Sequence, residues 1–310
     1  MKAVALREFG QAPEVIETSV PEPGAGEVRV RVHAASVNGF DLSVGKGMLQ
    51  GAMEHRFPVV LGKDFAGIVD ALGEGVEDYA VGDRVFGVVT KDYLGDGSFG
   101  QYVTVPTAVG LAPLPDEIEL THGAALGLAG SAAVMAVDAA DIREGATVLV
   151  VGATGGVGQQ ALQRAVRAGA TVVATAHTPQ EVERLTDLGA AHTVDHTGDL
   201  AAQVAQVAPQ GVDIALHFAG DPDVVARTVT HGGVLVSTML RSPADVHAPG
   251  VRVESIYAHP SREVLTRLAA DHAARNTTVT VQRLYDLEQT TAAFADFAAG
   301  TLGKLVIRIP

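Results

Sequence analysis

One short stretch of the chain restricts its possible folds more than any other. Residues 147–151 form an apolar, mostly β-branched run, and the pattern G-x-x-G-G-x-G follows from Gly152 to Gly158. Such a run predicts a buried strand, and the glycines predict a tight turn that opens directly into a helix. Backbone amides at a helix N-terminus attract anions, above all the pyrophosphate of a dinucleotide. The alternative is a glycine cluster that serves only the turn and its packing.

Strand and helix alternate after this turn. The first helix is predicted to stop at Gly169, and Thr178 with Glu181 predicts a capping box that starts the next one. Further strands are predicted at 171–174, 191–194, 212–217, 234–238 and 251–256. This alternation predicts parallel pairing through right-handed crossovers, which gives a doubly wound sheet of the Rossmann type.

The first 120 residues have the pattern of short strands broken by turns. Residues 28–32 alternate valine with arginine, which is the period of a half-buried strand, and turn-forming residues separate such runs. This spacing predicts a small β-barrel. In the tail we expect helices at 262–274 and 287–299 and strands at 277–281 and 303–309. These elements either extend the parallel sheet or return to the barrel.

Length and composition exclude several classes of protein. The 310 residues suit two domains, and an apolar content of 47% excludes intrinsic disorder. A net charge of −14 has the wrong sign for binding nucleic acid or an anionic membrane surface. Because the chain has no cysteine, disulfides, thiolate zinc sites and a cysteine nucleophile are excluded. An early charged N-terminus, and a weakly polar run (123–137) too short to span a membrane, predict a cytoplasmic protein.

The end of the second strand bears on the choice of dinucleotide. Sites for NAD usually place Asp or Glu there to hold the ribose 2′-hydroxyl, but residues 173–178 contain no carboxylate. Glu181 is explained by the capping box. The hydroxyls of Thr175 and Thr178, together with His177, suit a 2′-phosphate instead. The sequence therefore favours NADPH.

Further dinucleotide contacts follow from the same fold. Phe218 and Ala219 come directly after the fourth strand, and we expect them to border the nicotinamide ribose. The contacts expected at the glycine turn are Thr154, Gly155, Gly156 and Val157.

Eleven histidines raise the question of a metal site. His192 and His196 are four residues apart, but they flank a strand end, where such positions do not converge as they do on a helix. We therefore expect no bound metal, and we expect His196 to contact the cofactor.

A set of motifs occurs in a fixed order along nearly the whole chain. They are Ala35–Asp41 (ASVNGFD), Gly62–Val69 (GKDFAGIV), Val81–Val85 (VGDRV), the glycine turn, and Gly303–Val306 (GKLV). Together they resemble the medium-chain dehydrogenase/reductase superfamily, in particular its zinc-free quinone oxidoreductase (zeta-crystallin-like) branch. The resemblance implies a GroES-like β-barrel catalytic domain over 1–122, a Rossmann domain over 123–256, and a segment 257–310 that returns to the catalytic domain.

The resemblance also implies a site in the first domain. In zinc-dependent relatives a cysteine occupies the position of Asn38, and a His-Glu pair occupies those of Lys63 and Asp64. Asn38 is expected beside the nicotinamide and the substrate carbonyl, and Lys304 beside the cofactor. Asp41 either orients these groups or caps a helix. Lys63 is expected to reach the active site, whereas Asp64 is expected to fix a loop.

The chemistry follows by elimination. Alcohol oxidation needs a zinc ion or an activated Tyr-x-x-x-Lys pair, and no tyrosine of this chain has a lysine four residues later. Reduction of a quinone or a conjugated carbonyl mainly requires orientation and a dry site. We expect an NADPH-dependent, zinc-independent reductase of quinones or α,β-unsaturated carbonyl compounds. The alternative is a non-catalytic NADP(H)-binding redox sensor or structural protein on the same fold.

The last strand of the predicted parallel sheet, residues 251–256, would leave an open edge. Exposed edges are usually covered or paired, and in the resembling family this edge pairs across a two-fold axis. The sequence therefore predicts a homodimer.

Overall fold

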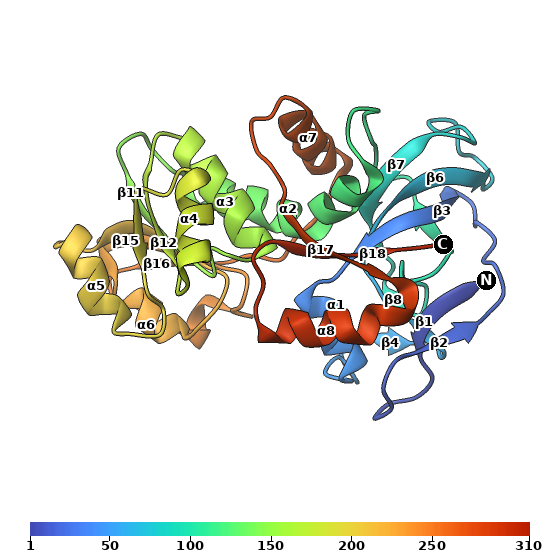
Figure 1. Ribbon diagram of the computed structural model, residues 1–310, viewed down its shortest axis with the longest axis horizontal. Coiled ribbons are helices and arrows are strands. Elements are labelled where there is room, and N and C mark those ends of the chain that lie inside the picture. Colours follow the sequence, from blue (N-terminus) through green and yellow to red (C-terminus); the bar gives the residue numbers. More distant parts are fainter. The chain divides into compact units, whose positions relative to one another are not determined.

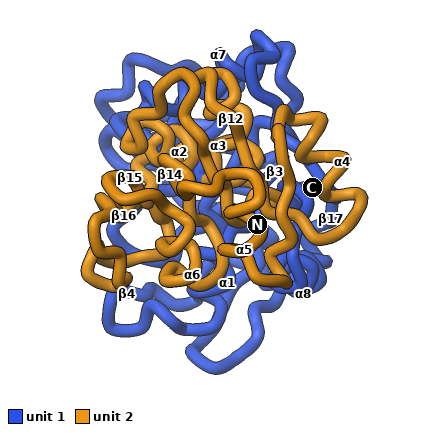
Figure 2. The backbone as a smooth tube through the Cα atoms, turned by 90° about the vertical axis from the view of Figure 1, so that its left-hand side faces the viewer, with its two compact units in different colours: residues 1–128, 260–310 blue, residues 129–259 orange.

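The computed structural model describes residues 1–310 and divides them into two compact units. Unit 1 comprises Met1–Leu128 and Pro260–Pro310, and unit 2 comprises Ala129–His259 (Figure 2). The sequence places these boundaries after residues 122 and 256. The first division falls later in the structure because helix α2 (Leu120–Ala140) continues through it without a break.

Unit 2 is built on a six-stranded sheet in which every neighbouring pair is parallel. The strand order is β13-β12-β11-β14-β15-β16. The chain starts at β11 in the centre, moves outward on one side, and returns to the centre to build the other side. This is the doubly wound arrangement that the sequence predicts. The strands are β11 (Thr147–Val151), β12 (Thr171–Thr175), β13 (His192–Val194), β14 (Val212–His217), β15 (Val229–Ser237) and β16 (Arg252–Ser255).

Helices connect these strands. Helix α3 (Gly156–Arg167) lies beside the sheet (Figure 1), and its Leu162 shares a buried apolar cluster with Val148 and Val150 of β11. The predicted capping box is present, because the Thr178 hydroxyl accepts a hydrogen bond from the Glu181 amide at 3.3 Å. The helices are α3 (Gly156–Arg167), α4 (Pro179–Asp187), α5 (Leu200–Val207), α6 (Pro222–Ala226) and the 3-10 turn η1 (Pro243–Asp245).

Unit 1 is built on short strands in three sheets. The largest has the order β10-β7-β6-β3-β18-β17, with β9 also paired to β3. Its strands are β3 (Glu27–Ser36), β6 (Asp64–Leu72), β7 (Arg84–Val88), β9 (Tyr102–Pro106), β10 (Leu111–Pro113), β17 (Val281–Asp286) and β18 (Lys304–Arg308). The smaller sheets contain β1 (Lys2–Leu6), β2 (Glu14–Glu17) and β5 (Val59–Val60), and β4 (Glu54–His55) with β8 (Tyr93–Leu94).

The C-terminal segment completes unit 1. Strand β18 lies between β3 and β17, antiparallel to β3 and parallel to β17. The tail therefore returns to the first unit and does not extend the parallel sheet, which settles the alternative that the sequence leaves open. The helical elements of this unit are α1 (Gly39–Gly45), α7 (Arg262–Ala273), η2 (Leu287–Gln289) and α8 (Thr290–Ala299).

The strand predicted at 277–281 is wrong. The amide of Thr277 bonds to the carbonyl of Asp271 in α7, so this β-branched run folds back along the helix end. The strand, β17, begins only at Val281, where the chain pairs with β18. Here tertiary contacts override the local preference of Thr and Val for strands.

Helix α2 is longer than the weakly polar run 123–137. By its length of 21 residues, and by an 18-residue window of mean hydropathy 1.5, this helix could cross a membrane. However, 72% of that window is buried inside the structure. A core helix has the same properties. The burial explains the apolar composition of α2 without a membrane.

Candidate functional site

The turn between β11 and α3 has the shape that the glycines predict. Gly152 has a φ of +78°, which L side chains rarely adopt. A Cβ on Gly158 would lie 2.2 Å from the carbonyl oxygen of Gly152, so α3 packs against the turn only because this residue is glycine. A Cβ on Gly155 would meet only that same oxygen, at 3.6 Å, so open space lies in front of Gly155.

The N-terminus of α3 suits a bound anion. Its N-cap is Gly155, and no side chain caps its first turn. In contrast, α4, α5 and α6 are each capped by a side chain, from Thr178, Asp199 and Asp221. The first amides of α3 are thus left for a ligand, as a pyrophosphate would require, and residues Thr154 to Val157 surround them.

Thr175 has a different role from the one expected. Its hydroxyl accepts a hydrogen bond from the amide of Gly152 at 3.0 Å and donates to the carbonyl of Val150 at 3.4 Å. The side chain is buried under the glycine turn. Thr175 therefore holds the turn in place and does not face a 2′-phosphate.

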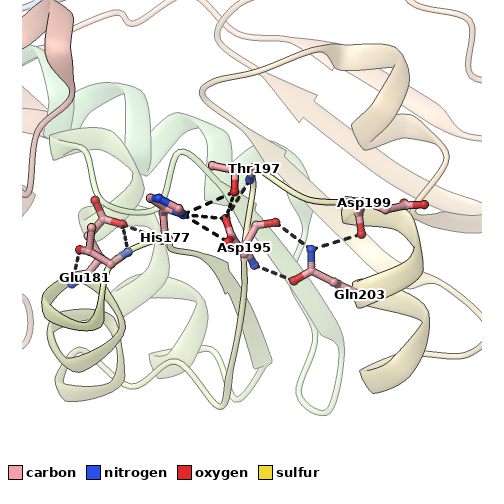
Figure 3. A network of polar contacts seen from close by, with 7 residues as sticks. His177, Glu181, Asp195, Thr197, Asp199 and Gln203 are labelled. Atoms are coloured by element: carbon pink, nitrogen blue, oxygen red, sulfur yellow. Dashed lines mark hydrogen bonds and ion pairs between the residues drawn. The ribbon is translucent and has the colours of Figure 1, made fainter.

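His177 lies at the end of β12 beside a carboxylate from the neighbouring strand (Figure 3). Its Nδ1 is 3.1 Å and 3.2 Å from the two carboxylate oxygens of Asp195, which directly follows β13. The amide and hydroxyl of Thr197 also bond to Asp195, and together with His177 they lower its pKa to about 2. The ring of His196 is 5.9 Å from that of His177.

Asp195 could not be identified from the residues that follow the second strand, because it follows the third. The parallel register places Thr175 opposite Val194, so the residues that follow the two strands become neighbours. The end of β12 therefore does have a carboxylate next to it, supplied by the third strand.

A second carboxylate lies at the start of α4. The side chain of Glu181 accepts hydrogen bonds from the amides of His177 at 2.7 Å and Thr178 at 3.1 Å. These amides are therefore already satisfied from within the helix. The hydroxyl of Thr178 is exposed beside them.

A buried histidine, His217, holds the turn after β14, and no sequence motif marks this residue. Nε2 of His217 lies 3.1 Å from the carbonyl of Gly220, and Nδ1 lies 2.8 Å from the hydroxyl of Ser237. Because a carbonyl only accepts, the proton is on Nε2, and burial lowers the pKa of His217. This contact fixes Phe218 and Ala219, and the Ala219 side chain lies 3.0 Å from the Cβ position of Gly152.

Unit 1 contains a buried polar cluster, which consists of Ser36, Asn38, Asp64 and Lys304. One carboxylate oxygen of Asp64 accepts from the Ser36 hydroxyl at 2.7 Å and from the Asn38 amide at 2.9 Å, and Lys304 Nζ lies 3.4 Å away. The other accepts from the amide of Leu128 at 2.7 Å. Lys304 also donates to Asn38 Oδ1 at 2.7 Å and to the carbonyl of Val37 at 2.9 Å.

This cluster changes the roles expected for two residues. Asp64 was expected to fix a loop, but it is the first residue of β6 and the centre of the cluster. Asn38 donates both amide hydrogens inward, to Asp64 and, at 3.3 Å, to the carbonyl of Ser36. Its side chain is therefore occupied in holding Lys304 and Asp64, and it presents no free donor to a substrate carbonyl.

Asp41 caps helix α1, which was one of its two expected roles. Its carboxylate accepts a hydrogen bond from the backbone amide of Asn38 at 2.8 Å, and the Asp41 side chain is buried. Burial raises the pKa of Asp41 to about 7, although the bond from Asn38 opposes the shift. Asp41 can therefore hold a proton near neutral pH.

Lys63 lies at the wall of a pocket within unit 1. Its Nζ donates to the carbonyl of Val89 at 2.7 Å and lies 4.8 Å from the centre of the Phe40 ring. Burial lowers the pKa of Lys63, and the carboxylates of Asp41 and Asp64 oppose this shift. The cavity is mainly apolar, with Phe40, Val44, Leu61 and Leu94 among its lining residues.

A polar group that sequence reasoning missed closes one side of this cavity. The Tyr93 hydroxyl donates to Asp96 at 2.5 Å, Lys91 donates to the same oxygen at 2.8 Å, and Arg56 lies 3.5 Å from the centre of the Tyr93 ring. Both Tyr93 and Asp96 line the cavity. These residues lie in a turn-rich segment without a recognisable motif, so only the folded chain brings them to the cavity.

The chain matches two known domain families. Residues 24–116 match the alcohol dehydrogenase GroES-like domain, and residues 156–253 match the zinc-binding dehydrogenase family. These matches lie in units 1 and 2, and they confirm the predicted fold class, a GroES-like domain with a Rossmann domain.

Individual proteins of known sequence are similar as well. Phthioceranic/hydroxyphthioceranic acid synthase of Mycobacterium tuberculosis (strain ATCC 25618 / H37Rv) is 36% identical over 220 residues, which are 70% of this chain and 10% of the synthase. The chain thus spans about a tenth of the length of such relatives. Quinone oxidoreductase of Sus scrofa is 27% identical over 328 aligned residues, covering 99% of this chain and 97% of the relative.

The whole chain also superposes on solved structures. A crystal structure of an NAD-dependent alcohol dehydrogenase has a TM-score of 0.88 at 28% identity, with 100% of both chains covered. The two matching domain families, the full-length similarity to a quinone oxidoreductase and this structural agreement lead to one assignment. The chain belongs to the medium-chain dehydrogenase/reductase superfamily, in its quinone oxidoreductase-like branch.

Proposed function

We propose that this protein is an NADPH-dependent, zinc-independent reductase of quinones or α,β-unsaturated carbonyl compounds. The observation that carries the proposal is Lys63, a half-buried ammonium group at the wall of an apolar cavity, with a buried polar cluster in the same unit. A cavity of this kind suits a flat, weakly polar substrate. The similarity to quinone oxidoreductase of Sus scrofa supports the same class of reaction.

The residues of unit 2 suit a dinucleotide. The uncapped N-terminus of α3 would hold the pyrophosphate, the open space before Gly155 admits it, and the turn after β14 would border the nicotinamide ribose. When bound, the reduced nicotinamide supplies a hydride. His177 and His196 lie at the ends of neighbouring strands, where this fold would place the 2′-phosphate of NADP(H).

Lys63 is the proposed proton donor. Hydride addition to a quinone or enone leaves negative charge on oxygen, and an ammonium group nearby stabilises that charge and supplies a proton. The lowered pKa of Lys63 makes its proton easier to release. Asp41 holds a proton near neutral pH and also lines the cavity, and we propose that it passes a proton back to Lys63.

The polar cluster supports zinc independence. Lys304 contacts both Asn38 and Asp64. In zinc-dependent relatives, a cysteine and a glutamate occupy these two positions. The ammonium group of Lys304 provides positive charge at this place and repels a second cation. We propose that Asn38 and Lys304 act as positioning residues, because their polar atoms are bonded to one another.

The test uses purified protein with NADPH and a panel of benzoquinone, phenanthrenequinone and cyclohexenone. The decrease in nicotinamide absorbance is measured before and after exhaustive chelation, and we expect the same turnover in both. We expect Lys63→Met to lower kcat about 100-fold, the usual contribution of a general acid, with unchanged affinity for NADPH. Lys46→Met, an exposed lysine in the same domain, is the matched control and is expected to keep full activity.

The outcomes separate the alternatives. Tight NADPH binding without turnover of any substrate would favour the non-catalytic sensor. Activity that chelation abolishes and zinc restores would contradict zinc independence. An unchanged kcat in Lys63→Met would remove Lys63 from the mechanism and leave the reaction class standing.

A further inference from the structure

We propose that His217 and Ser237 are a pair of positioning residues, which tie the turns after β14 and β15 to each other and thereby orient the nicotinamide end of the bound cofactor. This inference rests on the proposed function, in which a dinucleotide binds unit 2. It assigns a role to two fully buried polar side chains that the proposed reaction does not otherwise use.

Both residues lie at the carboxyl edge of the parallel sheet. His217 ends β14, Ser237 ends β15, and the strand register pairs the two residues directly. Strands β14, β15 and β16 are neighbours and form one half of the doubly wound sheet (Figure 2). In sheets of this type each half serves one nucleotide, and the ligand lies beyond the carboxyl ends of the strands. The turns after β14 and β15 are therefore the ones that a bound nicotinamide would meet.

The hydrogen bonds of His217 define its tautomer. Nε2 lies 3.1 Å from the carbonyl oxygen of Gly220, which only accepts, so Nε2 carries the ring proton. Nδ1 is then a bare acceptor, and it lies 2.8 Å from the hydroxyl oxygen of Ser237. Burial lowers the pKa of His217 and so favours this neutral ring. The Ser237 hydroxyl therefore donates its hydrogen to Nδ1.

The hydroxyl oxygen of Ser237 uses its full capacity for hydrogen bonds. Besides donating to His217, it accepts from the backbone amides of Met239 at 3.0 Å and Leu240 at 3.2 Å. A hydroxyl has one donor and two acceptor sites, so no site is left over. Because the His217 ring takes the hydroxyl hydrogen, both lone pairs of Ser237 are directed at the turn after β15.

The turn after β14 also packs against the glycine turn. The Ala219 side chain lies 3.0 Å from the Cβ position of Gly152, and the amide of Phe218 donates to the carbonyl of Val151 at 3.0 Å. Contacts thus run from the glycine turn to the turn after β14, and through His217 to the turn after β15. Hydride transfer needs the reacting atoms held in a narrow range, and a misplacement of about 1 Å can cost about 100-fold in rate.

The experiment uses two ligands that differ only in the nicotinamide. Dissociation constants of NADPH and of 2′-phospho-ADP-ribose, which lacks that ring, are measured for the whole chain by calorimetry. Ser237→Ala removes the hydroxyl that joins the two turns. We expect its affinity for NADPH to fall about tenfold, and its affinity for 2′-phospho-ADP-ribose to stay within about twofold. With benzoquinone at saturating NADPH, kcat should fall by up to about 100-fold while KM for the quinone stays unchanged.

Two substitutions of His217 break the link on one side at a time. The amide nitrogen of His217→Gln can reach the place of Nε2, which keeps a donor for the Gly220 carbonyl but removes the acceptor for Ser237. The amide oxygen of His217→Asn can take the place of Nδ1, which keeps the acceptor for Ser237 but removes the bond to Gly220. Either loss breaks a link between the turns, so both variants should lose NADPH affinity as Ser237→Ala does. Full NADPH affinity and kcat in either variant would overturn the inference, because one turn alone would then suffice.

Thr228→Val is the matched control. Thr228 directly precedes β15, at the end of the strand opposite to Ser237. Its hydroxyl is also buried, and it donates to the carbonyl of Val225 at 2.7 Å. Valine has a similar shape, so this variant removes one buried hydrogen bond from the same unit. We expect a lower melting temperature, as in Ser237→Ala, but unchanged affinity for both ligands.

Two further results would overturn the inference while leaving the proposed function intact. The first is a Ser237→Ala variant that loses affinity equally for both ligands, or that keeps both its NADPH affinity and its kcat. The second is an unmodified protein that binds both ligands equally, because the nicotinamide would then make no contact for the turns to orient. If neither ligand binds the unmodified protein, the proposed function itself is wrong.

Discussion

At the scale of single residues, unit 1 contains two charged side chains, Asp64 and Lys304, that are both buried. They contact each other and Asn38. Removing one member of such a pair costs about 3–5 kcal/mol, because the other charge is left without its partner in a medium that solvates it poorly. The cluster is therefore as important for the stability of unit 1 as for its chemistry.

We predict that Lys304→Met lowers the free energy of unfolding by about 3–5 kcal/mol, measured by urea denaturation. The double variant Lys304→Met with Asp64→Asn should recover a large part of the loss, since both charges are gone. Lys46→Met, on the surface, should change stability by no more than about 0.5 kcal/mol. Equal losses in the single and double variants would show that the charges do not act as a pair.

A second prediction concerns pH. The pKa of Asp41 is about 7 in the folded protein, compared with an ordinary value of 3.8. Between these values the folded chain keeps a proton that the unfolded chain has released, so the contribution of Asp41 to stability falls as pH rises and becomes constant above pH 7. Asp41→Asn, which cannot ionise, should gain about 2 kcal/mol relative to the unmodified protein between pH 5 and pH 7.5. A difference in unfolding free energy that is the same at both pH values would contradict this.

At the scale of elements, two glycines of the β11–α3 turn have different roles. Gly158 is required for packing, and Gly155 leaves space for a ligand. Gly158→Ala would place a methyl group 2.2 Å from the Gly152 carbonyl oxygen, whereas Gly155→Ala would extend into open space. We predict that Gly158→Ala strongly lowers the melting temperature. Gly155→Ala should keep the melting temperature and weaken NADPH binding at least about tenfold, because its methyl group occupies the place of the pyrophosphate. Thermal unfolding and a binding titration of both variants test this, and full affinity in Gly155→Ala would place the pyrophosphate elsewhere.

The distance along the sequence between contacting residues determines which of these features could be predicted. The glycine turn and the Thr178–Glu181 capping box were predictable because their partners lie within a few residues of one another. Asp195 was missed because its contact with His177 depends on the register of β12 against β13. The role of Asp64 was not predictable because its partners come from distant parts of the sequence. Asn38 lies between β3 and α1, and Lys304 is the first residue of β18. Local patterns carry no information about such long-range neighbours.

At the scale of the whole molecule, the parallel sheet ends in an edge strand. Strand β16 pairs only with β15, and its residues 253–255 are half-buried in the single chain. Unpaired strand edges favour association with another chain. We predict that the protein is a homodimer joined through β16, and light scattering at micromolar concentration should report twice the mass of one chain. A mass of one chain would contradict this proposal.

The position of β18 has a consequence for how the protein is made. Unit 2 is one continuous segment, but unit 1 consists of Met1–Leu128 together with Pro260–Pro310. Its main sheet stays incomplete until β18, which follows all of unit 2 in the sequence, inserts between β3 and β17. During synthesis, domains fold as their residues leave the ribosome. Unit 2 can thus be complete while the edge of β3 is still without β18. Until β18 is translated, Asp64 lacks the positive charge of Lys304.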